Sequence, residues 1–154
     1  MVNFEYRYAR FHSRYSHSML DTIFVYGTLL KQAGNMMANF LKANSEYLAE
    51  GYMRGKLYKV DFYPGALYEP EAETLVVGEV YRLRDVPKVL EVLDTYEGYD
   101  AEKEEQSLFL RRKVEVTVGN EVVTTWAYLY HASVEDLPLI VSGDFLQYEV
   151  NRYS

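Results

Sequence analysis

One glutamate of the sequence occupies a position suited to acid–base chemistry. The segment before it has apolar residues at the spacing i, i+3, i+4 and i+7 that is typical of one buried helical face: Val86, Val89, Leu90 and Leu93. Glu97 continues this face four residues after Leu93, and Gly98 supplies a stop signal for the helix. Partial desolvation there raises the pKa of a carboxyl from about 4.3 toward values at which it accepts protons. The alternative is that Glu97 only caps the helix or pairs with Arg111.

A glycine turn far upstream is the second candidate. The stretch "IFVYGTL" at residues 23–29 reads as a short apolar strand that is stopped by Gly27. A strand that ends in this way exposes the main-chain N–H groups of Thr28 and Leu29, and such groups bind carboxylates or developing oxyanions. Taken alone, the stretch favours a plain turn without a functional role.

Other catalytic chemistries are not supported by the sequence. The absence of cysteine excludes disulfides, thiolate zinc sites and a cysteine nucleophile. The patterns GxSxG, GxxxxGK, GxGxxG and HExxH do not occur. His12 and His17 lie five residues apart without flanking acidic or histidine partners, so we expect no metal and no cofactor. Catalysis must then come from hydroxyls, carboxylates and main-chain amides.

Size and charge limit the class of protein. A chain of 154 residues with 49% hydrophobic residues predicts one compact domain, which buries about two thirds of the surface of its unfolded form. The formal charge of −7 offers no basic field for nucleic acid. The sequence has neither a run of about 18–20 apolar residues nor a signal peptide. We therefore expect a cytoplasmic, soluble protein without nucleic-acid or membrane partners.

The first half of the chain predicts an arm followed by a mixed fold. Residues 1–20 are expected to form a flexible arm, and residues 21–154 the domain; Met19 is an alternative start of translation. A strand is predicted at 22–26 and a helix of two to three turns from 36 to near 44. Strands broken by turns are expected over 47–83, with Pro64 and Gly65 as a turn pair.

The second half begins with the helix that leads to Glu97, for which Asp85 is the predicted N-cap. The acidic stretch 100–107 is expected to be a solvated loop. The alternation in 108–118 and 121–130, around a "GN" turn, predicts a hairpin. A last amphipathic segment is expected to begin at Ser133, in a pattern close to a capping box.

Seven short motifs in a fixed order add a family resemblance. They are "FVYGTL" at 24–29, "YPGA" at 63–66, "VGEVY" at 77–81, "LDTYEG" at 93–98, "LRRKVEV" at 110–116, "WAYLY" at 126–130 and "SGDF" at 142–145. With these motifs the chain, over about residues 22–148, resembles the γ-glutamylcyclotransferase-like superfamily, which includes γ-glutamylamine cyclotransferases and the AIG2-like and YtfP-type proteins. The resemblance implies an α+β fold, with a small mixed β-barrel, flanking helices and one cavity.

The resemblance also implies a reaction and a set of residues. It implies an acyltransferase or lyase-type enzyme that cyclises a γ-glutamyl amine or peptide to 5-oxoproline and releases the amine. Glu97 corresponds to the general acid/base. The substrate-binding residues carried over are Tyr26, Gly27, Thr28 and Leu29, with Tyr128 as a lesser candidate.

Two departures and two alternatives accompany this expectation. Phe109 stands where many members have tyrosine, and Phe145 where tryptophan is usual in "SGDW". A non-catalytic small-ligand-binding module of the same fold is one alternative. The other is hydrolysis by Glu97 together with a second carboxylate such as Glu79.

Overall fold

The computed structural model describes residues 19–30 and 33–152, so the expected arm at residues 1–20 lies outside them except for its last two positions. The elements follow in the order β1 (Thr22–Val25), α2 (Met36–Ala43), β2 (Ser45–Lys59), β3 (Pro64–Tyr68), β4 (Leu75–Leu83), α3 (Val86–Tyr96), the short 3₁₀ helix η2 (Glu104–Gln106), β5 (Phe109–Val118), β6 (Glu121–Tyr130) and α4 (Phe145–Arg152).

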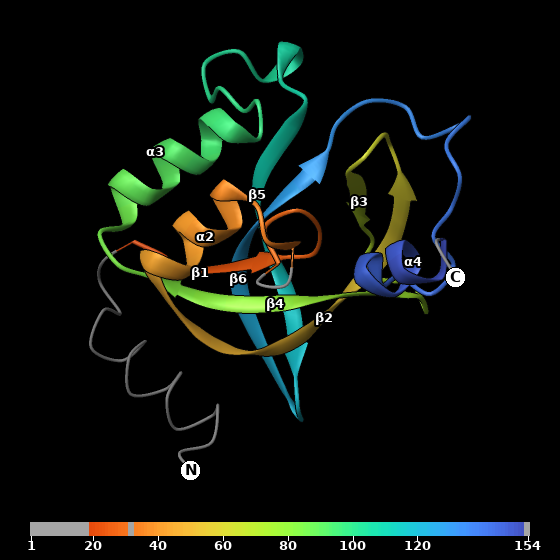
Figure 1. The fold of residues 1–154 in the computed structure, drawn as a ribbon, viewed down its shortest axis with the longest axis horizontal. Helices are drawn as coiled ribbons and strands as arrows, with labels where there is room; N and C mark the ends of the chain where they lie inside the picture. The colour runs from red at the N-terminus through yellow and green to blue at the C-terminus, as the bar shows by residue number, and fades with distance from the viewer. Residues whose placement is uncertain (1–18, 31–32, 153–154) are drawn as a thin grey trace.

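Five of the strands close into a barrel (Figure 1). Their order is β2-β4-β1-β6-β5, and β5 pairs back to β2 through Met53 and Val116. The pairing of β1 with β6 is parallel, whereas the other pairings in the barrel are antiparallel. The sixth strand, β3, extends the sheet by pairing with the end of β2. The expected α+β fold with a small mixed barrel and flanking helices is confirmed.

The central strand β1 is buried on both faces, which suits its mainly apolar sequence Thr-Ile-Phe-Val. Because side chains alternate along a strand, Ile23 and Val25 pack with the helices while Phe24 and Tyr26 belong to the cluster inside the barrel. The strand therefore joins the two parts of the core, and the turn that follows it lies at one end of the barrel.

Helices α2 and α3 lie together on one side of the barrel, and α4 lies apart from them (Figure 1). The predicted helix near 36–44 is confirmed as α2, whose N-cap is Asn35. Helix α3 buries Val89, Leu90 and Leu93, as its periodicity predicts. Asp85 does stand at the N-cap of α3, but its φ of 43° is left-handed and its side chain makes no capping bond. The side-chain cap predicted there is absent.

Two local predictions are wrong. Pro64 and Gly65 are not a turn pair but the start of β3, because proline is tolerated as the first residue of an edge strand. The pattern at Ser133 that is close to a capping box does not start a helix either. The segment after it instead pairs with the end of β2: Lys59 donates to the carbonyl of Pro138 (2.9 Å), and Ile140 donates to the carbonyl of Leu57 (2.8 Å).

The predicted hairpin is confirmed as β5 and β6, in register from Phe109 opposite Tyr130 to Val118 opposite Glu121. Within residues 19–30 and 33–152, no helix is long and apolar enough to cross a membrane.

Candidate active site

The turn after β1 is fixed to the helix that follows it. The N–H of Leu30 donates to the carbonyl of Gly27 (3.1 Å), which closes a tight turn. Asn35 Nδ2 donates to the carbonyl of Thr28 (2.6 Å), while Asn35 Oδ1 accepts from the N–H of Ala38 (2.8 Å). One side chain thus caps α2 and holds the turn.

Glycine is required at position 27 by a close approach across the barrel end. A Cβ atom on Gly27 would lie 2.7 Å from Cγ and 2.8 Å from Cδ of Pro64. Both distances are shorter than van der Waals contact, so any larger residue would push the turn and β3 apart.

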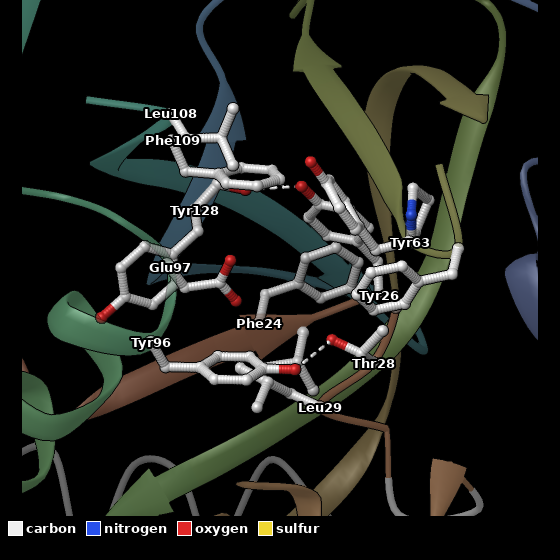
Figure 2. Close-up of a pocket in the computed structure, with 14 residues that line it drawn as sticks. Phe24, Tyr26, Thr28, Leu29, Tyr63, Tyr96, Glu97, Leu108, Phe109 and Tyr128 are labelled. Carbon is white, nitrogen blue, oxygen red and sulfur yellow. Dashed lines mark hydrogen bonds between the residues drawn. The ribbon is translucent and has the colours of Figure 1, made fainter. Parts of the chain in front are cut away.

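Glu97 follows the last turn of α3, and its N–H donates to the carbonyl of Leu93 (2.9 Å). Gly98 then takes a left-handed φ of 67° and ends the helix as predicted. Figure 2 shows the Glu97 carboxylate directed into a pocket, with Thr28 and Leu29 on another wall. The expected continuation of the apolar face therefore points the carboxylate inward.

The environment of this carboxylate is apolar. Burial raises the pKa of Glu97 from 4.5 to about 8. The side chain as a whole is only half-buried, because the pocket opens to solvent. Among the described residues, Glu97 has no hydrogen-bond or ion-pair partner for its carboxylate. The group is therefore free to exchange a proton with a bound molecule.

The pocket has a volume of about 150 Å³ and lies between β1 and the turn after it, the loop before β3, the end of α3, the start of β5 and the last part of β6. Its lining is mainly aromatic and aliphatic, and consists of Phe24, Val25, Tyr26, Gly27, Thr28, Leu29, Phe62, Tyr63, Pro64, Tyr96, Glu97, Leu108, Phe109 and Tyr128. Glu97 is the only acidic residue among these lining residues, and none of them is lysine, arginine or histidine.

Arg111 pairs with Asp94 rather than with Glu97. Its Nε and Nη2 donate to the two carboxylate oxygens of Asp94 at 2.8 and 3.2 Å, and its guanidinium lies over the Trp126 ring at 4.5 Å. Tyr128 donates its hydroxyl to the same Asp94 (2.7 Å). The alternative in which Arg111 neutralises Glu97 is therefore wrong, and the pair instead ties the end of α3 to β5 and β6.

The hydroxyl of Tyr26 is used within the protein. It donates to the carbonyl of Tyr128 (2.6 Å) and accepts from the N–H of Ala66 (3.2 Å). Burial, with the charge of Glu97 and despite the bond from Ala66, raises the pKa of Tyr26 far above its ordinary value. The ring of Tyr26 therefore lines the pocket, while its hydroxyl links β1, β3 and β6.

All six site residues suggested by the sequence line this one pocket: Glu97, Tyr26, Gly27, Thr28, Leu29 and Tyr128. Their roles in catalysis and binding remain predictions. Sequence reasoning missed the loop residues Phe62, Tyr63 and Leu108 and the helix residue Tyr96. Tyr63 is the first residue of the motif "YPGA", but the proline and glycine of that motif suggested only a turn.

Glu79 lies elsewhere. It lines a second hollow with Glu50 and Asp144, and its carboxylate accepts from the hydroxyl of Tyr81 (3.0 Å). Since Glu79 and Glu97 line different hollows, the two-carboxylate hydrolysis that pairs them has no geometric basis. In the described part of the chain, no group of three or more metal-ligating side chains is placed to hold a metal ion.

Related proteins align in sequence with most of this chain. The chain is 33% identical over 126 residues to the gamma-glutamylcyclotransferase family protein YtfP of Citrobacter rodentium, with 80% of this chain and 94% of the relative covered. It is 30% identical over 125 residues to the YtfP protein of Escherichia coli K12, with 80% and 95% covered.

Solved structures share the fold. The solution structure of Escherichia coli YtfP matches with a TM-score of 0.58 and 29% identity, over 83% of this chain and 98% of that one. The crystal structure of a mouse AIG2-like protein matches with a TM-score of 0.59 and 21% identity, over 78% and 85%. The model of the family described as gamma-glutamyl cyclotransferase, AIG2-like, matches residues 23–147. The chain therefore belongs to the AIG2-like gamma-glutamyl cyclotransferase family.

Proposed function

We propose that this protein is a γ-glutamylcyclotransferase, in which Glu97 transfers protons while a γ-glutamyl group closes on itself to give 5-oxoproline and a free amine. The observation that carries the proposal is the Glu97 carboxylate, which has no hydrogen-bond or ion-pair partner among the described residues and is directed into a pocket whose other wall is the turn at Gly27. Membership of the family supports the same reaction class.

Binding of the γ-glutamyl group is assigned to the turn. The main-chain N–H groups of Thr28 and Leu29 hold the substrate carboxylate or the oxyanion that develops at the γ-carbonyl. This role suits a pocket with no cationic side chain among its described lining residues, because neutral donors must then bind the anion. The aromatic rings exclude water and hold the substrate in its folded, reactive shape.

The chemical step requires only proton transfers from the protein. Glu97 accepts a proton from the α-ammonium group, and the resulting amine attacks the γ-carbonyl carbon. As the bond to the leaving nitrogen breaks, Glu97 returns the proton to that nitrogen. The surplus proton of the new ring nitrogen leaves by the same route, so the products are the neutral lactam ring and the amine as its ammonium ion. Holding nucleophile and carbonyl together supplies effective molarities on the order of 10⁵–10⁸ M.

The raised pKa suits this exchange. Burial brings the pKa of Glu97 from 4.5 to about 8, which is closer to the pKa of an amino group than that of an ordinary carboxyl is. Transfer of a proton from the α-ammonium group to Glu97 therefore costs less free energy than transfer to an unperturbed carboxylate, which favours acid–base catalysis.

The test is Glu97→Gln, which keeps the shape of the side chain and removes the proton transfer. Release of 5-oxoproline from a panel of γ-glutamyl amines and peptides is followed by mass spectrometry. We expect turnover to fall by roughly 10²–10⁴ or more, while substrate still binds in calorimetry. The matched control is Glu91→Gln, an exposed position on the same helix, which should keep full turnover.

Two outcomes contradict the proposal. Full turnover by Glu97→Gln removes Glu97 from the chemistry. Binding of γ-glutamyl compounds by the unaltered protein without any 5-oxoproline identifies a ligand-binding module instead.

A further inference from the structure

The mouth of the pocket carries exposed apolar side chains. Phe62 is 72% exposed, Leu108 41% and Tyr96 40%, and all three line the pocket. They come from three separate segments: the loop before β3, the loop before β5 and the last residue of α3. Exposed hydrophobic residues that converge on one opening indicate contact with a ligand more than isolated ones do.

The enclosed part of the pocket is small. Its volume of about 150 Å³ is that of an apolar cavity that accommodates a benzene-sized molecule. If the proposed function holds, the compact γ-glutamyl group fills this space, since Glu97 must reach its amine. The amine that is released then has to lie across the mouth.

The mouth is held in place by the backbone and by neighbouring groups. Leu108 donates its N–H to the carbonyl of Gly98 (3.0 Å), and its carbonyl accepts from the N–H of His131 (3.1 Å). The hydroxyls of Tyr96 and Thr28 share a hydrogen bond of 2.9 Å across the opening (Figure 2). The exposed apolar groups are therefore positioned before substrate arrives, which lowers the entropy cost of binding.

The side chain of Phe62 extends this surface. Its ring meets Tyr63 edge-on at 5.1 Å, and Tyr63 in turn approaches Phe109 at 6.1 Å. A continuous row of rings thus leads from the solvent into the pocket.

We propose that the amine released by this protein carries a branched aliphatic or aromatic group, so that its substrates are γ-glutamyl amides of apolar amines. An apolar group gains free energy by leaving water for Phe62 and Leu108. The charged end of a cationic amine gains no such contact, and none of the described lining residues other than Glu97, which the reaction occupies, offers a carboxylate to it. This inference rests on the proposed function, because it assigns the part of the substrate that leaves.

Three synthetic substrates separate the possibilities: the γ-glutamyl amides of isopentylamine, methylamine and 1,5-diaminopentane. We expect kcat/KM for the isopentylamide to exceed that of the methylamide, and that of the cationic amide, by roughly tenfold. A tenfold preference is the low end of the discrimination that an apolar pocket gives for added methylenes. We expect the low end because the mouth is open to solvent and buries the apolar group only in part.

Variants assign the preference to the mouth. Phe62→Ser and Leu108→Ser should each bring the isopentyl-to-methyl ratio of kcat/KM toward one. Leu75→Ser is the matched control, since Leu75 is likewise 41% exposed but lines neither described pocket, and it should leave the ratio unchanged.

Failure of this inference differs from failure of the proposed function. Equal rates for all three amides, or a preference for the cationic one, overturn the apolar mouth while 5-oxoproline release stands. Absence of 5-oxoproline from these amides and from the whole panel of γ-glutamyl amines and peptides overturns the proposed function; calorimetric affinities for the three amides then decide whether the mouth prefers apolar groups. Equal affinities in that measurement overturn the apolar mouth as well.

Discussion

Arg111 and Asp94 are joined by two hydrogen bonds, from Nε to Oδ1 at 2.8 Å and from Nη2 to Oδ2 at 3.2 Å. Asp94 lies three residues before Glu97. The guanidinium is stacked on Trp126, and Asp94 also accepts from Tyr128. The last turn of α3 is thereby attached to the barrel, and the direction of Glu97 follows from that attachment.

Arg111→Lys should act on catalysis through position. Lysine keeps the charge but loses the two-pronged bond and the stacking. We expect kcat to fall by about 10–100-fold with a smaller change in KM, because small displacements of a catalytic group are costly. The free energy of unfolding should fall by about 1–2 kcal/mol. Arg112→Lys is the control, since Arg112 pairs with Glu104 in a more exposed ion pair; equal kinetic effects of the two variants contradict the positioning role.

The stability of the protein should depend on the ionisation of Glu97. Its pKa is raised by burial from 4.5 to about 8 in the folded state. Below pH 4.5 both folded and unfolded states hold the proton, and between pH 4.5 and 8 the unfolded state releases it first, so the free energy of unfolding falls as pH rises. Above about pH 8 this decrease in the free energy of unfolding is complete.

Glu97→Gln should remove this pH dependence. At pH 8.5 we expect the free energy of unfolding of this variant to exceed that of the unaltered protein by about 1–3 kcal/mol, after allowance for the solvent that reaches the pocket. At pH 4.5 we expect almost no difference. Urea unfolding at both pH values measures the difference, with Glu91→Gln for comparison. An equal shift at the two pH values would show that the carboxylate is not desolvated.

Gly27→Ala should be poorly tolerated because of the atoms it meets. Its Cβ would lie 2.7 Å from the Pro64 ring, and overpacking of this kind costs about 1–3 kcal/mol. The shifted turn should also weaken substrate binding. At Gly119 a Cβ meets nothing within 4 Å and only the φ of +59° opposes alanine, so Gly119→Ala should cost about 1 kcal/mol and leave turnover intact.

Tyr26→Phe tests whether the hydroxyl is structural. Its removal leaves the N–H of Ala66 and the carbonyl of Tyr128 without this partner, at a cost of about 1–3 kcal/mol in the free energy of unfolding. Because the hydroxyl is turned to the protein, kcat/KM should change little. Loss of activity with unchanged stability would instead assign the hydroxyl to the substrate.

The parts of the site that depend on local patterns could be predicted from the sequence. Glu97 follows from the helical spacing of Leu90 and Leu93, and the turn follows from a short strand stopped by Gly27. Both signals lie within one element, where side-chain periodicity decides which residues face inward.

The mouth of the pocket could not be predicted in this way. Phe62 belongs to a loop within a stretch for which the sequence predicts only strands broken by turns, and Leu108, which the sequence predicts as the first residue of the hairpin, lies in the loop just before β5. Their positions depend on strands that pair far along the chain. The start of β3 at Pro64 shows the same limit, because proline and glycine favour a turn locally while pairing with β2 imposes a strand.

The parallel contact between β1 and β6 has a consequence for the order of folding. Thr22 donates to the carbonyl of Thr124 and Tyr26 donates to that of Tyr128, and each pair is separated by 102 residues. Contacts of such high sequence separation form slowly, because the chain loses loop entropy before they contribute. The pocket combines residues from both strands, so it exists only after the barrel has closed. Recovery of ligand binding during refolding should therefore coincide with the slowest structural phase, and neither half of the chain should show it alone.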